Sequence, residues 1–92
     1  KNKINAIHRV FTGSLNTSVA HPREIFRSAL LNNGARILVY HNHPSGNTEP
    51  SEADLIFTKR MEEAGSILGI DLLDHIIVSG KEWLSLREYG IL

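Results

Sequence analysis

Two histidines, a serine and an aspartate stand close together in the middle of the chain, in the stretch YHNHPSGNTEPSEAD. His41 and His43 are two residues apart, so on a β-strand both side chains leave the same face. Two imidazoles and a carboxylate can hold a catalytic zinc and leave a fourth position open for water. The spacing therefore predicts a metal site, with Asp54 as the third ligand because it follows one turn into the next predicted helix.

The same residues also fit a simpler interpretation, a turn followed by a capped helix. Ser51 and Asp54 have the S-x-x-[DE] spacing of a helix N-cap. An acidic residue in the first turn is stabilised by the helix dipole whether or not it binds a metal. The combined pattern favours the metal site, because a helix cap does not need two histidines at the end of the preceding strand.

Alternating strand and helix patterns must position these residues. An apolar run, Ile37 to Tyr40, predicts a strand buried on both faces and leads directly into the histidines. A helix is predicted from Ser51, with Gly69 at its end. The other predicted elements are a strand over 4–11, a helix over 21–34, a strand over 70–80 and a short helix near the C-terminus. This alternation predicts an α/β fold, a mixed β-sheet flanked by helices.

Length and composition restrict the alternatives. The 92 residues suffice for one domain, and 41% hydrophobic with 22% charged residues is typical of a globular chain. The chain has no cysteine, so any metal must use His, Asp or Glu. Its formal net charge of zero disfavours a large nucleic-acid interface, although a local basic patch would be compatible with it. No apolar run approaches the ~20 residues of a membrane helix, and no signal peptide is visible, so we expect a cytoplasmic location.

A resemblance to a known family joins these observations. His41-x-His43, seven residues, Ser51, two residues and Asp54 match the H-x-H-x7-S-x2-D core of the JAMM (JAB/MPN+) metalloprotease motif. The segments NAIHRVFTGSLN and HPREIFRSALLNNG through DHIIVSG resemble the bacterial RadC branch, over nearly the whole chain. The resemblance implies a JAB/MPN, cytidine-deaminase-like architecture. We expect residues 1–92 to form a single domain, a C-terminal fragment that lacks the first strand.

The resemblance also implies roles for the motif residues. His41, His43 and Asp54 would bind Zn²⁺, and Ser51 would hydrogen-bond the water or the developing oxyanion. The reaction would be hydrolysis of a peptide or isopeptide bond by a zinc-activated water. The family's general base is a glutamate on an upstream strand, whereas Glu24 alone precedes His41 here and matches a different position. A catalytically weak metal-binding interaction module of a RadC protein, a family with a DNA-repair label, therefore stays open as the alternative.

Partners and the remaining residues follow from the same reasoning. A peptide or protein substrate is expected, with no membrane contact, and direct nucleic-acid binding is disfavoured. An absent first strand would expose a sheet edge, which predicts pairing into a homo-oligomer. Asp74 and His75 fit either a structural hydrogen bond or support of a metal ligand from behind. Trp83 and Tyr89 are expected to pack in the core rather than to form a partner surface.

Overall fold

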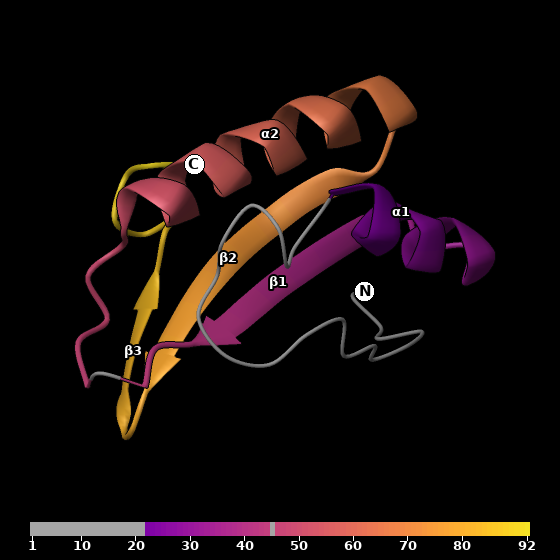
Figure 1. Ribbon diagram of the computed structural model, residues 1–92. Coiled ribbons are helices and arrows are strands. Elements are labelled where there is room, and N and C mark those ends of the chain that lie inside the picture. The colour runs from indigo at the N-terminus through magenta and orange to yellow at the C-terminus, as the bar shows by residue number, and fades with distance from the viewer. Residues whose placement is uncertain (1–21, 45) are drawn as a thin grey trace.

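The computed structural model describes residues 22–44 and 46–92, and the fold is an α/β arrangement of two helices and a three-stranded sheet (Figure 1). The strands lie in the order β1-β2-β3, with β1 and β2 parallel and β2 and β3 antiparallel. The predicted mixed sheet flanked by helices is confirmed. The strand predicted over 4–11 lies outside the described residues. The elements are α1 (Pro22–Leu31), β1 (Arg36–Asn42), α2 (Glu52–Leu68), β2 (Asp71–Ser79) and β3 (Glu82–Ser85).

Both helices begin and end where local chemistry favours it. Pro22 is the first residue of α1, where its missing N–H and fixed φ cost nothing. The exit from α1 passes through Asn33 at φ 54°, a left-handed conformation that asparagine tolerates. Ser51 is the N-cap of α2, and Gly69 ends that helix at φ 74°.

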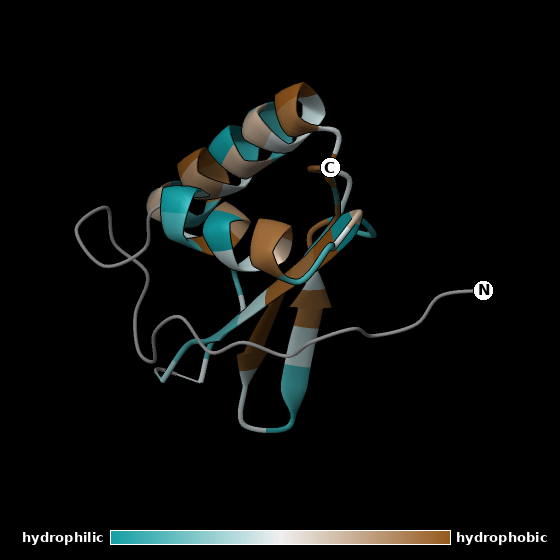
Figure 2. Cartoon of the chain, turned by 90° about the vertical axis from the view of Figure 1, so that its right-hand side faces the viewer, coloured by the Kyte–Doolittle hydropathy of each residue, from teal (hydrophilic) through white to brown (hydrophobic). Residues whose placement is uncertain are grey.

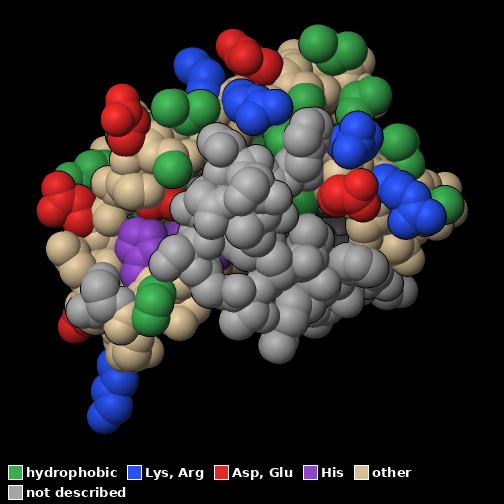
Figure 3. All heavy atoms as spheres, viewed as in Figure 1, with side chains coloured by type: hydrophobic (Ala, Val, Ile, Leu, Met, Phe, Trp, Pro, Cys, Tyr) green, Lys and Arg blue, Asp and Glu red, His purple; other side chains and the backbone are tan. Residues whose placement is uncertain are grey.

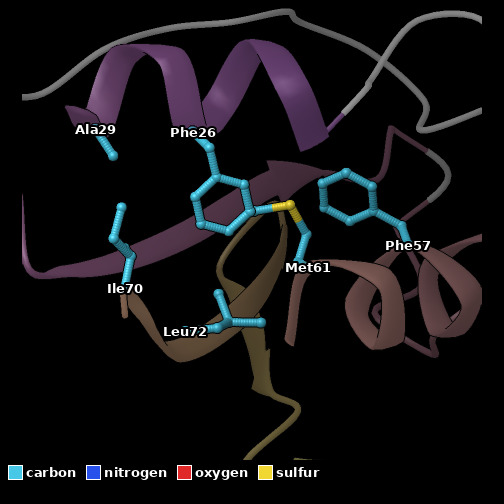
Figure 4. Packing of buried hydrophobic residues seen from close by; sticks show 6 residues of the cluster. All are labelled: Phe26, Ala29, Phe57, Met61, Ile70 and Leu72. Atoms are coloured by element: carbon cyan, nitrogen blue, oxygen red, sulfur yellow. The ribbon is translucent and has the colours of Figure 1, made fainter. Parts of the chain in front are cut away.

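The core forms where both helices meet one face of the sheet. Figure 4 shows Met61 reaching from α2 toward the ring of Phe26 on α1, with Phe57 on its other side. Contacts between a thioether and aromatic rings add to the burial of apolar area. Figure 2 shows the two helices packed together on the strands. The buried cluster consists of Phe26, Ala29, Phe57, Met61, Ile70 and Leu72.

The prediction that β1 is buried on both faces is wrong. Burial alternates along the strand: Ile37 and Val39 are partly buried against the core, whereas Leu38 and Tyr40 are 53% and 60% exposed. The reason is that α1 and α2 contribute to a single core on one side of the sheet. The side of β1 that carries its apolar Ile37 and Val39 is also the side from which His41 points.

The prediction of a short helix near the C-terminus is also wrong. Glu82–Ser85 forms β3, which pairs antiparallel with β2 through a turn in which Gly80 adopts φ 60°. After β3 the chain makes turns only, with Tyr89 N donating to Ser85 O at 2.9 Å. Pairing with β2 thus competes successfully for residues whose helical pattern extends over little more than one turn.

The connection between β1 and β2 determines where the candidate site lies. Two parallel neighbours need a crossover, and here α2 supplies it. The loop after β1 therefore leads into the N-terminus of α2 at the end of the sheet where β1 stops (Figure 1). This geometry brings the end of one strand and the first turn of one helix together.

Candidate metal centre

His41 and His43 leave the end of β1 on the same side, as the i, i+2 spacing predicts. His41 pairs with Ile77 of β2, and the pairing continues beyond the strand end through the His43 N–H, which donates to Val78 O at 2.8 Å. The Ser79 hydroxyl donates to the His43 carbonyl. The two imidazole centroids lie 4.8 Å apart. The backbone on both sides of the pair is thus held by hydrogen bonds to β2.

Asp54 reaches the same point from α2. Its N–H donates to Ser51 Oγ at 3.1 Å, and the Ser51 N–H donates to Asp54 Oδ2 at 2.7 Å, a complete capping box. The carboxylate is fully buried. The two interpretations of the sequence are therefore compatible, because the capping residue is also the carboxylate that faces the histidines.

Three potential ligand atoms converge here. The group His41, His43 and Asp54 could hold a metal ion, with one ligand atom from each residue and all three within 4.8 Å of one another. His41 Nε2 lies 3.1 Å from Asp54 Oδ1, and His43 Nε2 lies 3.1 Å from Asp54 Oδ2. Ligand atoms around a tetrahedral zinc are about 3.3 Å apart. The spacing is thus suitable for a small cation.

The first of these contacts is unusual for a protein interior. Among the described residues, His41 Nε2 and Asp54 Oδ1 are buried and have no hydrogen-bond partner, although they lie within ion-pair distance of each other. Buried polar atoms are nearly always satisfied, and an exception calls for an explanation such as an absent ion. A cation between the two atoms would satisfy both.

The chemistry of His43 fits the same ion. Its Nδ1 lies 2.9 Å from the Asn47 carbonyl oxygen, which can only accept, so Nδ1 carries a proton. A neutral His43 then presents a bare Nε2 to the Asp54 carboxylate. Metal-binding histidines commonly donate their second N–H to a carbonyl in this way. The side chain of His43 is 14% exposed, against 4% for His41, so the group opens to solvent beside His43.

The electrostatics keep Asp54 ionised. Burial by itself would raise the pKa of the Asp54 carboxyl. The neighbouring His41 and the interactions with Ser51 outweigh that cost and hold the pKa well below its usual range. The Asp54 side chain is therefore an anionic carboxylate at neutral pH and can act as a charged ligand. On the face drawn in Figure 3, histidine side chains reach the surface beside acidic ones.

Behind the ligand group lies a second buried set of polar residues. His41 Nδ1 is 2.8 Å from His75 Nε2, and His75 Nδ1 is 2.6 Å from Thr58 Oγ1. Thr58 in turn donates to the Asp54 carbonyl at 2.7 Å. Burial lowers the pKa of His75 from 6.5 to about 4. The neighbouring His41 lowers this pKa further, while Asp54 and Asp74 raise it. His75 is therefore a neutral imidazole at neutral pH.

Asp74 and His75 were expected either to form a structural hydrogen bond or to support a metal ligand, and each residue has one of these roles. His75 supports His41, whereas the Asp74 carboxylate accepts from its neighbour's backbone N–H, from the Ser85 hydroxyl and from the Arg87 N–H, and holds the turn after β3. Nothing in the motif spacing marks Thr58. The available signal was a polar residue at i+4 from Asp54, in a helix stretch that is otherwise apolar on its buried side.

The other candidate residues lie away from this group. Glu24 is on the exposed first turn of α1, 3.8 Å from Arg23. Trp83 and Tyr89 are 61% and 62% exposed, so the expectation that they pack in the core is wrong: β3 carries Trp83 on its open side, and Tyr89 belongs to the final turns. The two remaining histidines of the sequence, His8 and His21, and Ser45 in the loop after β1 lie outside the described residues. Within the described part of the chain, no helix is long and apolar enough to cross a membrane.

Comparison with known proteins agrees with the geometry. Residues 1–91 match the family model of the RadC-like JAB domain. A UPF0758 protein of Enterococcus faecalis is 59% identical over 88 residues, which are 96% of this chain and 38% of that protein. A UPF0758 protein of Clostridium beijerinckii is 51% identical over 92 residues, all of this chain and 40% of that protein.

A third relative, a UPF0758 protein of Listeria welshimeri, is 51% identical over 90 residues, 98% of this chain and 40% of that protein. The chain thus spans about two fifths of the length of these relatives. The mixed sheet with flanking helices and the buried His-His-Asp group are consistent with a JAB fold and a JAMM-like metal site. On the extent of the family match and the identity to these relatives, the chain belongs to the RadC-like JAB domain family.

Proposed function

We propose that the chain carries a zinc centre of the JAMM type, with His41, His43 and Asp54 as ligands, built for hydrolysis of peptide or isopeptide bonds. One observation supports it most directly: His41 Nε2 and Asp54 Oδ1 are buried, face each other at 3.1 Å and have no hydrogen-bond partner among the described residues. Buried polar atoms without a partner cost free energy, and a cation bound to both atoms would remove that cost.

The donor set supports zinc over other common ions. Two imidazole nitrogens and one carboxylate oxygen form a three-ligand set of the kind found in catalytic zinc sites, which keep a fourth position open. Calcium and magnesium take six or more ligands, mostly oxygen. The sequence has no cysteine, so softer thiolate sites are excluded.

The chain's own residues have distinct tasks in this proposal. The two imidazoles and the carboxylate hold the ion, and the capping box fixes the carboxylate's orientation. Ser51 Oγ accepts from the Asp54 N–H, which leaves its own O–H proton to donate toward a water or a developing oxyanion. Zinc, when bound, would supply Lewis acidity, which makes water a nucleophile near neutral pH and polarises a carbonyl.

A general base is the part this sequence does not provide. Glu24 is the one glutamate before His41, and it lies exposed on α1, beside Arg23 and outside the His-His-Asp group. The family resemblance places the base on an upstream strand. Because the chain spans about two fifths of its relatives, hydrolysis by the whole protein stays a proposal, and we expect this chain alone to turn over slowly.

The second candidate function is a metal-binding interaction module without turnover. It is kept as a candidate because no glutamate of the described residues belongs to the His-His-Asp group. Both functions need the same metal, so metal binding is tested first and hydrolysis afterwards.

Metal analysis of the purified chain tests the site. We expect one zinc per chain, with a loss of most of it in Asp54→Asn, which keeps the volume and removes the charge. Asp71→Asn is the matched control, because Asp71 is exposed at the start of β2. Zinc retained equally in Asp54→Asn and Asp71→Asn would refute the assignment.

Hydrolysis is tested with a fluorogenic peptide and with an isopeptide between a lysine side chain and a glycine carboxyl. General acid–base help is typically worth ~10²–10⁴-fold. We expect the chain to cleave these probes slowly and a form extended at its N-terminus by about twenty residues to cleave them faster by a factor in that range. Zinc binding without cleavage in both forms would support the interaction module.

A further inference from the structure

The buried hydrogen bonds behind His41 form a chain whose direction the chemistry determines. It runs from His41 Nδ1 to His75 Nε2 at 2.8 Å, from His75 Nδ1 to Thr58 Oγ1 at 2.6 Å, and from Thr58 Oγ1 to the Asp54 carbonyl at 2.7 Å. All four residues are at most 6% exposed. Water therefore does not offer alternative partners, and each contact needs one proton.

The carbonyl end fixes the direction. A carbonyl oxygen only accepts, so the single proton of the Thr58 hydroxyl points to the Asp54 carbonyl. The Thr58 oxygen must then accept from His75, which places the His75 proton on Nδ1 and leaves Nε2 bare. A bare His75 Nε2 accepts from His41, so the His41 proton lies on Nδ1. His41 Nε2, the atom that faces Asp54, then carries no proton and has a free lone pair.

We propose that His75 and Thr58 are positioning residues that hold His41 in the Nδ1–H tautomer and so keep its Nε2 ready for a metal ion. The inference rests on the proposed metal site. It adds that a threonine that touches neither the ion nor a ligand side chain selects the protonation pattern of a ligand. Histidines that bind metals are commonly oriented by an acceptor behind them, usually a carboxylate, carbonyl or water. Here the acceptor is another imidazole, whose own tautomer the helix sets through Thr58.

The arrangement also joins the two elements that carry the ligands. The chain starts at a ligand on β1, crosses to β2 and ends on the backbone carbonyl of the ligand on α2. If the network served stability alone, reversing its direction in a variant would leave metal binding unchanged. The proposed role requires one direction, and that difference can be measured.

Long-range ¹H–¹⁵N NMR of the metal-free chain is the test, recorded with a chelator at a pH where each imidazole carries one proton. We expect His41 and His75 both protonated on Nδ1. A His41 proton on Nε2 in the unmutated chain would overturn the proposal, and this result does not depend on any variant folding.

Thr58→Val supplies the second arm, with Thr58→Ser as its matched control. Valine keeps the shape but removes the acceptor, so the buried His75 ring should move its proton to Nε2 and donate to His41. His41 should then carry its proton on Nε2. Serine should restore the original pattern. An unchanged His41 tautomer in folded Thr58→Val would overturn the proposal.

Zinc affinity gives a readout of the consequence. Loss of the group behind a metal-binding histidine typically costs 10–100-fold in metal affinity. We expect a loss of about that size for Thr58→Val in chelator competition, recovered in Thr58→Ser. Equal zinc affinity in the two variants would contradict the positioning role. If no form bound zinc, the proposed metal site would fail, whereas the tautomer result would still decide the hydrogen-bond direction.

Discussion

The buried His75 should make the stability of the metal-free chain depend on pH. Burial lowers its pKa from 6.5 to about 4, with His41 adding to the effect. Between these values the unfolded chain binds a proton that the folded chain does not, so the free energy of unfolding rises with pH in this window. The contribution of His75 to the free energy of unfolding is fully present above about pH 6.5 and is lost as the pH falls toward 4.

The size of the effect follows from the shift. The difference between 6.5 and about 4 corresponds to about 3 kcal/mol in total, of which about 2 kcal/mol is lost between pH 7.5 and 5. The groups that face His75 are His41 and His43 from β1 and the loop after it, Asp54 from α2 and its neighbour Asp74. Because several neighbouring groups act on His75, a single unfolding curve cannot isolate its contribution.

Comparison with His75→Gln isolates the contribution of His75, because glutamine cannot titrate but keeps a hydrogen-bond acceptor and donors. Urea unfolding of both chains, with chelator present, at several pH values from 7.5 to 5 gives the measurement. We expect the stability difference between them to shrink by about 2 kcal/mol toward pH 5, because only the chain with His75 loses this contribution.

A control variant separates the pH-dependent effect of His75 from a general loss of stability. Ile77→Val removes one buried methylene from the same strand and should lower stability by about 1 kcal/mol at every pH. If the curves for the unmutated chain and His75→Gln stay parallel between pH 7.5 and 5, His75 is not held neutral by burial and the reasoning fails.

Three further results are expected. Gly65→Ala should lower the free energy of unfolding by about 2–3 kcal/mol by urea titration, since a Cβ there would lie 2.2 Å from the Ile70 carbonyl oxygen; Ser66→Ala, on the exposed side of the same helix, should not. Ser51→Ala should cost about 1 kcal/mol in the same assay and weaken zinc binding, because the cap also orients Asp54. Glu24→Gln should leave cleavage of the peptide probes unchanged, and a loss of cleavage would mean that this exposed glutamate is the base.

Elements defined by local signals were predictable. Proline at the start of α1, a serine cap and glycine end on α2, and apolar runs in β1 and β2 each act over a few residues. The errors arise where distant residues decide. Glu82–Ser85 forms β3 because β2 offers it a partner. Leu38 and Tyr40 of β1 are exposed because the two described helices pack on the other side of the strand.

In the candidate site, too, local patterns were predictable and contacts between distant residues were not. The i, i+2 histidines and the S-x-x-D cap are short patterns, and they meet because a crossover helix must start near the end of its strand. Sequence spacing could thus predict the convergence of His41, His43 and Asp54. It could not predict that Thr58 completes a proton chain with His75, because these residues are 17 apart and meet only when α2 packs on β2.

That packing has a consequence for how the site forms. Asp54 takes part three times: its N–H bonds the Ser51 hydroxyl, its carboxylate faces the histidines, and its carbonyl accepts from Thr58. The start of α2, the ligand geometry and the tautomer of His41 therefore depend on one residue whose side chain is fully buried. A ligand group held by these hydrogen bonds would need little reorganisation on binding the proposed ion.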